Sequence, residues 1–229
     1  MRTIGVVGGI GPESTIDYYR MILAVTRERG LDGAPPVLIS SIDVDRLLVL
    51  AGADDKGELI EYLLRSVEVL ARGGADLALF AANTPPVVFD EVAARAPIPM
   101  VSIVAATCDV AEHKGLRRLG LIGTRFTMQG GFYPAVFGTR GLSVVVPGGD
   151  DQTYVHTKYV TELLLGTFAN DTRDGMCRVL DRLREHNAID GVILGGTELP
   201  LLLRGVDYPV PFLDTARIHV AATVTQAAG

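Results

Sequence analysis

The 229-residue sequence contains no tryptophan and only two cysteines, Cys108 and Cys177. Two cysteines are too few for a disulfide framework, and the spacing between Cys108 and Cys177 is not typical of metal ligands. We therefore expect no metal and a cytoplasmic location. No apolar run reaches the roughly 18 residues that a membrane helix needs, and no cluster of Lys and Arg is present to displace counterions from a nucleic acid. The sequence predicts neither a membrane protein nor a nucleic-acid-binding protein.

The formal net charge is −6 at pH 7. An acidic protein can still bind an anion if backbone N–H groups, helix N-termini or a single arginine hold it. Dinucleotide binding is disfavoured, because Gly9-x-Gly11-x-x-Ser14 lacks the third glycine of the fingerprint and Pro12 has no N–H for a phosphate. The sequence also lacks a P-loop lysine, a His-Glu metal pair and a Gly-x-Ser-x-Gly elbow. We expect no cofactor.

Short apolar runs alternate with stretches of helical periodicity. The runs at 3–9, 37–43 and 76–84 predict strands that are apolar on both faces, as in a parallel sheet. Pro12 opens a predicted helix with an apolar face formed by Ile16, Tyr19, Ile22 and Leu23. This alternation predicts an α/β fold with helices on both faces of parallel sheets.

The second half of the sequence resembles the first. The matching pairs, with their offsets in residues, are TIGVVGG (3–9) with RLGLIGT (118–124) at 115, DLALFAANT (76–84) with DGVILGGTE (190–198) at 114, and PIPMVS (97–102) with PVPFLD (209–214) at 112. Three matches in one order predict two α/β halves related by a pseudo-twofold axis. We assign residues 1–100 and 211–229 to the first half and residues 101–210 to the second.

Small and polar residues follow four predicted strands, at 8–11, 82–84, 123–124 and 195–198. Ligands of open parallel sheets bind beyond the carboxyl ends of the strands, so these segments are expected to line a cleft between the halves. Backbone N–H groups and polar side chains there would suit a carboxylate and the enediolate formed when a proton leaves the neighbouring carbon. The predicted substrate-binding residues are Gly11, Arg46, Asn83, Thr84, Thr124, Thr127 and Thr197. The alternative is local, because Asn and Thr often cap helices and glycines often serve turns.

Arg46 is the candidate partner for a second carboxylate of the substrate, with an ordinary surface arginine as the alternative. Three residues are candidates for moving a proton. Glu198 follows a predicted strand and has helix capping as its alternative, Asp43 ends the second strand, and His156 stands at the head of a helix predicted over 154–165.

Five blocks of the sequence resemble the motifs of the aspartate/glutamate racemase family. They are GGIGPESTIDYYR (8–20), AANTPPVVFDEV (81–92), LIGTRFTMQGGFY (121–133), GGTELPLLL (195–203) and PFLDTARIH (211–219). The resemblance implies two flavodoxin-like halves and catalysis without pyridoxal phosphate, nucleotide or metal. In that family one thiolate removes the α-proton of an amino acid and a thiol returns a proton on the opposite face.

The sequence departs from the family at both thiol positions, which are Ala82 and Gly196 here. Neither side chain can carry a proton. Cys108 and Cys177 lie in predicted helices and are interpreted as packing residues. We therefore expect that two-thiol racemisation is lost, through substitutions that are either natural or engineered.

Three functions remain open. The first is binding of a small carboxylate or acidic amino acid followed by another enolate-type reaction, namely isomerisation, decarboxylation or elimination. The second is a non-catalytic binder of a small acidic metabolite, and the third is residual racemisation through other groups. The sequence does not fix the oligomeric state, although two-domain enzymes of this size often form homodimers.

Overall fold

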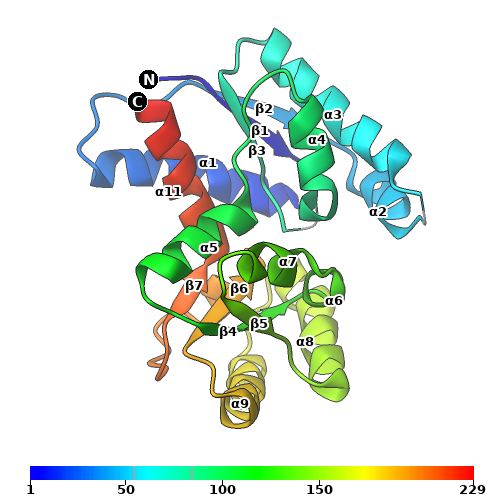
Figure 1. The fold of residues 1–229 in the computed structure, drawn as a ribbon, viewed down its shortest axis with the longest axis vertical. Coiled ribbons are helices and arrows are strands. Elements are labelled where there is room, and N and C mark those ends of the chain that lie inside the picture. The colour runs from blue at the N-terminus through cyan, green and yellow to red at the C-terminus, as the bar shows by residue number, and fades with distance from the viewer. Residues whose placement is uncertain (54, 84) are drawn as a thin grey trace. The chain divides into compact units, whose positions relative to one another are not determined.

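The computed structural model describes residues 1–53, 55–83 and 85–229. It divides into unit 1, Met1–Ile103 with Ala216–Gly229, and unit 2, Val104–Thr215 (Figure 1). Each unit contains one sheet in which every paired strand runs parallel to its neighbour. The predicted α/β fold with two parallel-sheet halves is confirmed.

Unit 1 is built on a sheet of order β2-β1-β3. Its strands are β1 (Ile4–Gly8), β2 (Val37–Ser41) and β3 (Leu77–Phe80), and a single parallel bridge joins Ala78 to Met100. Its helices are α1 (Pro12–Glu28), α2 (Val44–Gly52), α3 (Gly57–Arg72), the short 3₁₀ turn η1 (Pro85–Val88), α4 (Phe89–Arg95) and the final helix α11 (Thr215–Ala228). Helix α5 (Ile103–His113) begins where unit 1 ends.

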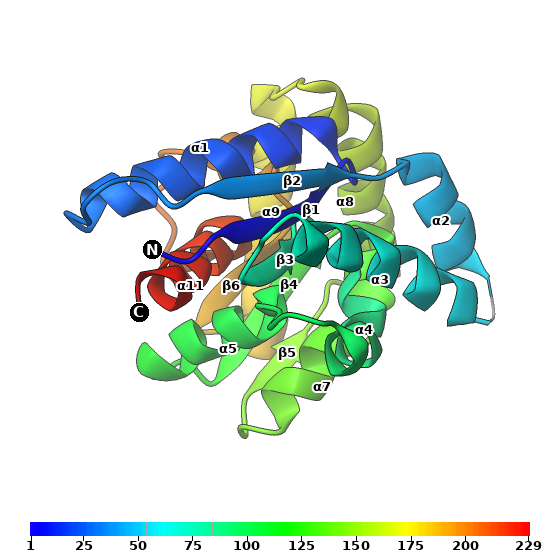
Figure 2. The ribbon, with the colours of Figure 1, turned by 90° about the horizontal axis from the view of Figure 1, so that it is seen from above.

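Helices cover both faces of the unit 1 sheet (Figure 2). Ile4 and Val6 of β1 share a buried cluster with residues of α1 and α11. On the other face, a Cβ at Gly5 would lie 3.1 Å from the Leu70 side chain of α3, so this glycine lets helix and strand approach closely. The apolar face predicted for α1 is wrong in part, because Ile16 and Tyr19 are exposed while Tyr18, Ile22 and Val25 are buried.

Unit 2 is built on a sheet of order β5-β4-β6-β7. Its strands are β4 (Arg118–Gly123), β5 (Ser143–Val145), β6 (Gly191–Gly195) and β7 (Phe212–Asp214). Its remaining elements are α6 (Arg125–Gln129), α7 (Phe132–Gly138), α8 (Gly149–Thr161), η2 (Leu163–Leu165), α9 (Asn170–Asn187) and α10 (Leu199–Leu202). Side chains of α8 and α9 pack on Ile122, Val192 and Leu194 of the sheet, whereas α7 lies on the opposite side of the sheet from α9 (Figure 1).

The same local contacts recur in the two units. The Asp76 carboxylate accepts a hydrogen bond from the Thr3 N–H, and Asp190 accepts from the N–H groups of Arg117 and Arg118. In each unit an aspartate just before one strand thus binds the start of the neighbouring strand. The Ala78–Met100 bridge of unit 1 likewise corresponds to the pairing of β6 with β7 in unit 2. These repeated contacts give the sequence repeat a structural counterpart in each unit.

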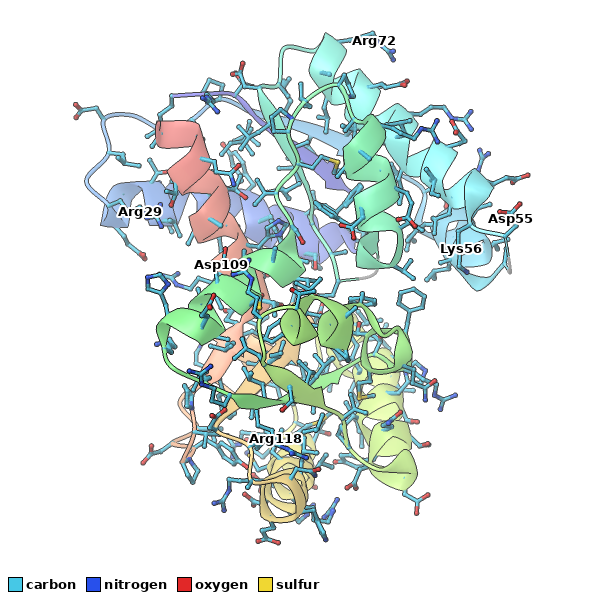
Figure 3. The ribbon with its side chains drawn as sticks, viewed as in Figure 1. Arg29, Asp55, Lys56, Arg72, Asp109 and Arg118 are labelled. Carbon is cyan, nitrogen blue, oxygen red and sulfur yellow. The ribbon has the colours of Figure 1, made fainter. Side chains whose placement is uncertain are left out.

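Charged side chains are distributed over the outside of both units. Arg29 follows α1, Arg72 ends α3 and Arg118 begins β4 (Figure 3). Within the residues that the structure describes, none of the helices is long and apolar enough to span a bilayer.

Candidate functional site

In unit 1 the loop after β1 is shaped by glycine. Gly9 has φ +82°, and a Cβ there would lie 2.6 Å from Ser41 Oγ, so a side chain would be strained in conformation and in space. The Gly9 N–H donates to Thr15 Oγ1 at 2.9 Å, and that hydroxyl donates to the Gly11 carbonyl at 3.1 Å. Gly11 is the N-cap of α1 and contributes no side-chain cap. The Gly9 N–H and the Gly11 carbonyl are therefore engaged by Thr15, and the half-buried residues of the loop at the carboxyl end of β1 are Ile10 and Gly11.

The segment after β3 lies at the same edge of the unit 1 sheet, since β1 and β3 are parallel neighbours. Ala82, the first predicted thiol position, is buried at 9% exposure, and Asn83 beside it is also buried. Thr84 lies outside the described residues. The structure thus brings the loops that contain Gly11 and Asn83 to one edge, with a methyl group at residue 82.

Asp43 and Arg46 lie together beyond β2, but each is engaged locally. Asp43 is the N-cap of α2, and its Oδ1 accepts from the N–H groups of Asp45 and Arg46. The Arg46 guanidinium lies 4.9 Å from the ring centre of Tyr62, a cation–π contact. Both side chains are exposed. Capping occupies one oxygen of Asp43, which weakens its case as a base, whereas the Arg46 guanidinium keeps N–H groups for an anion.

In unit 2 the candidate threonines gather where β4 ends. Thr124 is the N-cap of α6 and accepts from the Thr127 N–H, while the two hydroxyl groups lie 3.1 Å apart. Thr127 is buried, and a Cβ added to Gly195 on neighbouring β6 would lie 2.9 Å from its methyl group. The two threonines therefore bond each other, and glycines on β4 and β6 let α6 approach the strand ends closely.

His156 is in the middle of α8 rather than at the head of a helix, which corrects the predicted span 154–165. The helix begins earlier because Asp150 and Asp151 favour its first turn. His156 Nδ1 accepts from the Arg125 N–H at 3.3 Å. Burial, and then the positive charge of Arg125, lower the pKa of this histidine. A neutral ring with one nitrogen occupied therefore lies beside the carboxyl end of β4.

Gly196, the second predicted thiol position, is closed off by an aromatic residue from α8. A Cβ placed on Gly196 would lie 2.6 Å from Cε2 and 2.7 Å from Cζ of Tyr159, and closer still to its hydroxyl. Tyr159 is buried at 4% exposure and belongs to the unit 2 core. Any side chain at residue 196 would therefore require the phenol to move. The space next to this backbone position holds a phenol hydroxyl.

The Tyr159 hydroxyl donates a hydrogen bond to Oε2 of Glu198, and Thr197 Oγ1 donates to the same oxygen at 2.9 Å. Burial, followed by the neighbouring Glu198 carboxylate, raises the pKa of Tyr159 well above its ordinary value. The phenol therefore keeps its proton and is the donor to Glu198. Glu198 is the N-cap residue of α10, as its predicted alternative has it, but its side chain makes no capping hydrogen bond.

Tyr159 was not predicted from the sequence. The signal available was indirect, namely a glycine where the family has a side chain, which leaves space that some other residue must fill. The cysteines do not fill it. Cys108 is fully buried in α5 and Cys177 packs on the unit 2 core from α9, and burial raises the pKa of both thiols. Among the described residues no group of three or more His, Cys, Asp or Glu side chains has the arrangement of a metal site.

Comparisons with known proteins identify the family and the fold of this chain. The profile of the Asp/Glu/Hydantoin racemase family matches residues 7–223. The fold is similar to that of a candidate Asp/Glu racemase from Yersinia pestis, with 32% identity, 100% of both chains covered and a TM-score of 0.91. An aspartate racemase homologue from Pyrococcus horikoshii gives 34% identity, 100% coverage of both chains and a TM-score of 0.88.

A third structure is more distant. The glutamate racemase from Francisella tularensis in complex with D-glutamate has 15% identity and a TM-score of 0.69, with 98% of this chain and 80% of that chain covered. At this identity the likeness shows the fold alone. The family profile and the two closer structures extend over nearly the whole chain, and the chain therefore belongs to the Asp/Glu/Hydantoin racemase family.

Proposed function

We propose that this chain binds a small carboxylate or an acidic amino acid at the carboxyl ends of its strands and converts it through an enolate-type intermediate. The reaction class is isomerisation, decarboxylation or elimination rather than two-thiol racemisation. The observation that carries this proposal is the replacement of the second family thiol by a glycine whose side-chain space is filled by Tyr159, hydrogen-bonded to Glu198.

The donors at the strand ends support binding of a carboxylate. In unit 1 the half-buried backbone of Ile10 and Gly11 follows β1, and Asn83 adds a buried side-chain amide at the same edge. In unit 2 the Thr124 hydroxyl follows β4, beside the parallel strand β6, whereas the Thr197 hydroxyl after β6 already donates to Glu198. Fixed donors of this kind stabilise the negative charge that develops on a carboxylate when the neighbouring carbon loses a proton. That the two sets of donors face one substrate stays a prediction.

The residues at the two thiol positions argue against racemisation. A methyl group at residue 82 and a hydrogen at residue 196 neither remove nor return a proton. Cys108 is buried in α5 and Cys177 is half-buried in α9, and burial raises the pKa of both thiols, which favours the protonated thiol over the nucleophilic thiolate. Enolate formation needs a base on one face only, so a single base other than these thiols is sufficient for it, whereas two-base inversion needs a proton carrier on each face.

An acidic amino acid is supported as a ligand by the family and by Arg46. The glutamate racemase of Francisella tularensis was crystallised in complex with D-glutamate, which carries two carboxylates. Arg46 is exposed beyond β2, and its stacking on Tyr62 pre-orients the guanidinium for a distal carboxylate.

A thermal-shift screen tests the binding step. The probes are both enantiomers of aspartate, glutamate and malate, and asparagine and glutamine serve as controls without the distal carboxylate. A ligand at 100 times its Kd adds about 2.7 kcal/mol to the free energy of unfolding, so at least one dicarboxylate should raise the melting temperature clearly. If no dicarboxylate stabilises the protein more than its amide control does, carboxylate binding is refuted.

A further inference from the structure

Resting on the proposed function, we propose that Glu198 is the base that removes the proton next to the substrate carboxylate, and that Tyr159 is the positioning residue that holds it. The family position that carries a thiol is then served by two side chains. One of them, Tyr159, comes from α8, and the other, Glu198, lies two residues beyond Gly196.

The Tyr159 phenol and the missing side chain of Gly196 are complementary in space. The phenol occupies the volume that a side chain at residue 196 would need, and only a glycine at that position leaves room for it. Tyr159 is anchored on its apolar side in the unit 2 core, together with Val155 and Leu163 of the neighbouring turns. The hydroxyl is therefore held at the carboxyl end of β6 by packing, before any ligand binds.

Glu198 has the geometry of an oriented base. Both donors, Tyr159 and Thr197, bind its Oε2, and within the described part of the chain no residue contacts Oε1 through a hydrogen bond or ion pair. The side chain is half-buried, so it is neither freely hydrated nor sealed in the core. A carboxylate fixed through one oxygen presents the other in a defined direction, which is what general-base catalysis requires.

The proposed step balances as a proton transfer. The C–H bond next to the substrate carboxylate breaks, its electron pair moves into the carboxylate to give an enediolate, and Glu198 Oε1 receives the proton. Glu198 becomes a neutral acid whose Oε2 still accepts from Tyr159. The proton then returns to the carbon and restores the substrate, or the enediolate continues to product. His156, also on α8, is already engaged by the Arg125 N–H and takes no part in this step.

Because the proposed step uses a single base, exchange should take place on one face only. In deuterated water the acid form of Glu198 exchanges its proton with solvent and returns deuterium to the carbon from which the proton left. The expected signature is deuterium at the α-carbon with retention of configuration, whereas a two-base racemase gives exchange together with inversion.

The experiment incubates the full-length protein with each enantiomer of aspartate, glutamate and malate in deuterated water. Mass spectrometry measures deuterium at the α-carbon, and chiral chromatography measures configuration.

Glu198→Gln should reduce exchange at least a hundredfold, in the range for loss of a general base (about 10²–10⁴-fold), and Glu198→Asp should keep part of it. Tyr159→Phe should reduce exchange about tenfold, roughly 1.4 kcal/mol, while the ligand-induced thermal shift stays unchanged.

Tyr154→Phe is the matched control, because Tyr154 is another phenol of α8 that packs on the same core. It should leave exchange unchanged. Exchange with retention that persists in Glu198→Gln overturns Glu198 as the base while leaving the proposed function standing. An unaltered exchange rate in Tyr159→Phe, or a rate that falls together with the ligand-induced thermal shift, overturns the positioning role, and exchange with inversion in the wild type overturns the one-base step. Wild-type protein that exchanges no probe refutes both this step and the proposed enolate chemistry, even if a dicarboxylate binds.

A stability measurement tests the reciprocal fit without any substrate. Gly196→Ala should lower the urea midpoint of unfolding in the wild-type background, because the new methyl group collides with the phenol. In a Tyr159→Leu background the same substitution should change the midpoint little. Equal losses in the two backgrounds would show that Tyr159 does not occupy the space beside residue 196.

Discussion

His219 gives unit 1 a dependence on pH that can be worked out from its contacts. Its ring is 1% exposed. Nε2 lies 2.9 Å from the Val101 carbonyl, which can only accept, and Nδ1 lies 3.1 Å from the Tyr18 hydroxyl. The proton therefore resides on Nε2, and Nδ1 accepts from Tyr18. Protonation would place a charge in the core and remove that acceptor.

Burial lowers the pKa of His219 from 6.5 to about 4, against a smaller opposing effect of the hydrogen bond to Val101. In the unfolded chain the ring binds a proton below about pH 6.5, so between that value and about pH 4 the unfolded state binds more protons than the folded state. Stability must therefore fall as the pH falls through this window. Between pH 7 and pH 5 the loss is about 2 kcal/mol, since each pKa unit corresponds to about 1.4 kcal/mol.

The assay compares wild-type protein with His219→Gln, which keeps a donor and an acceptor but does not titrate. Urea unfolding is followed at pH 7 and pH 5, and hydrogen exchange of α11 amides reports on unit 1. The wild type should lose about 2 kcal/mol more than the variant between the two pH values, and His113→Gln, at an exposed position of α5, should behave as the wild type. Equal losses in the wild type and His219→Gln would refute a neutral buried His219.

Further predictions concern stability elsewhere in the chain. Ala188 has φ +49° at the end of α9, so Ala188→Gly should raise stability by about 0.5–1 kcal/mol, whereas Gly115→Ala, at φ +70° with no close neighbours, should lower it similarly in chemical unfolding. Leu63→Ala in the core of unit 1 should cost about 2–5 kcal/mol by the same measurement, because the side chain is fully buried. Asp190→Ala removes the acceptor of two backbone N–H groups and should cost about 1–3 kcal/mol, with faster hydrogen exchange at the start of β4.

Local pattern was enough for the strands and for the class of fold. The apolar runs at 3–9 and 118–124 predicted buried strands, and their repetition predicted two parallel-sheet halves, because a strand carries its signature within a few adjacent residues. The buried face of α1 was assigned incorrectly in part. Helical periodicity permits neighbouring faces, and contact with His219 of α11, 201 residues away in sequence, selects Tyr18 over Tyr19.

The candidate site also combines features that the sequence predicts with features that only the fold determines. The sequence by itself determined that residues 82 and 196 carry no proton and that polar residues follow the strands, since these are matters of residue identity and order. Only the tertiary structure decided what stands beside residue 196. Tyr159 is brought there by the packing of α8 on the sheet, and its bond to Glu198 spans 39 residues. A contact between distant segments depends on how helices pack on strands, and no short stretch of sequence encodes it.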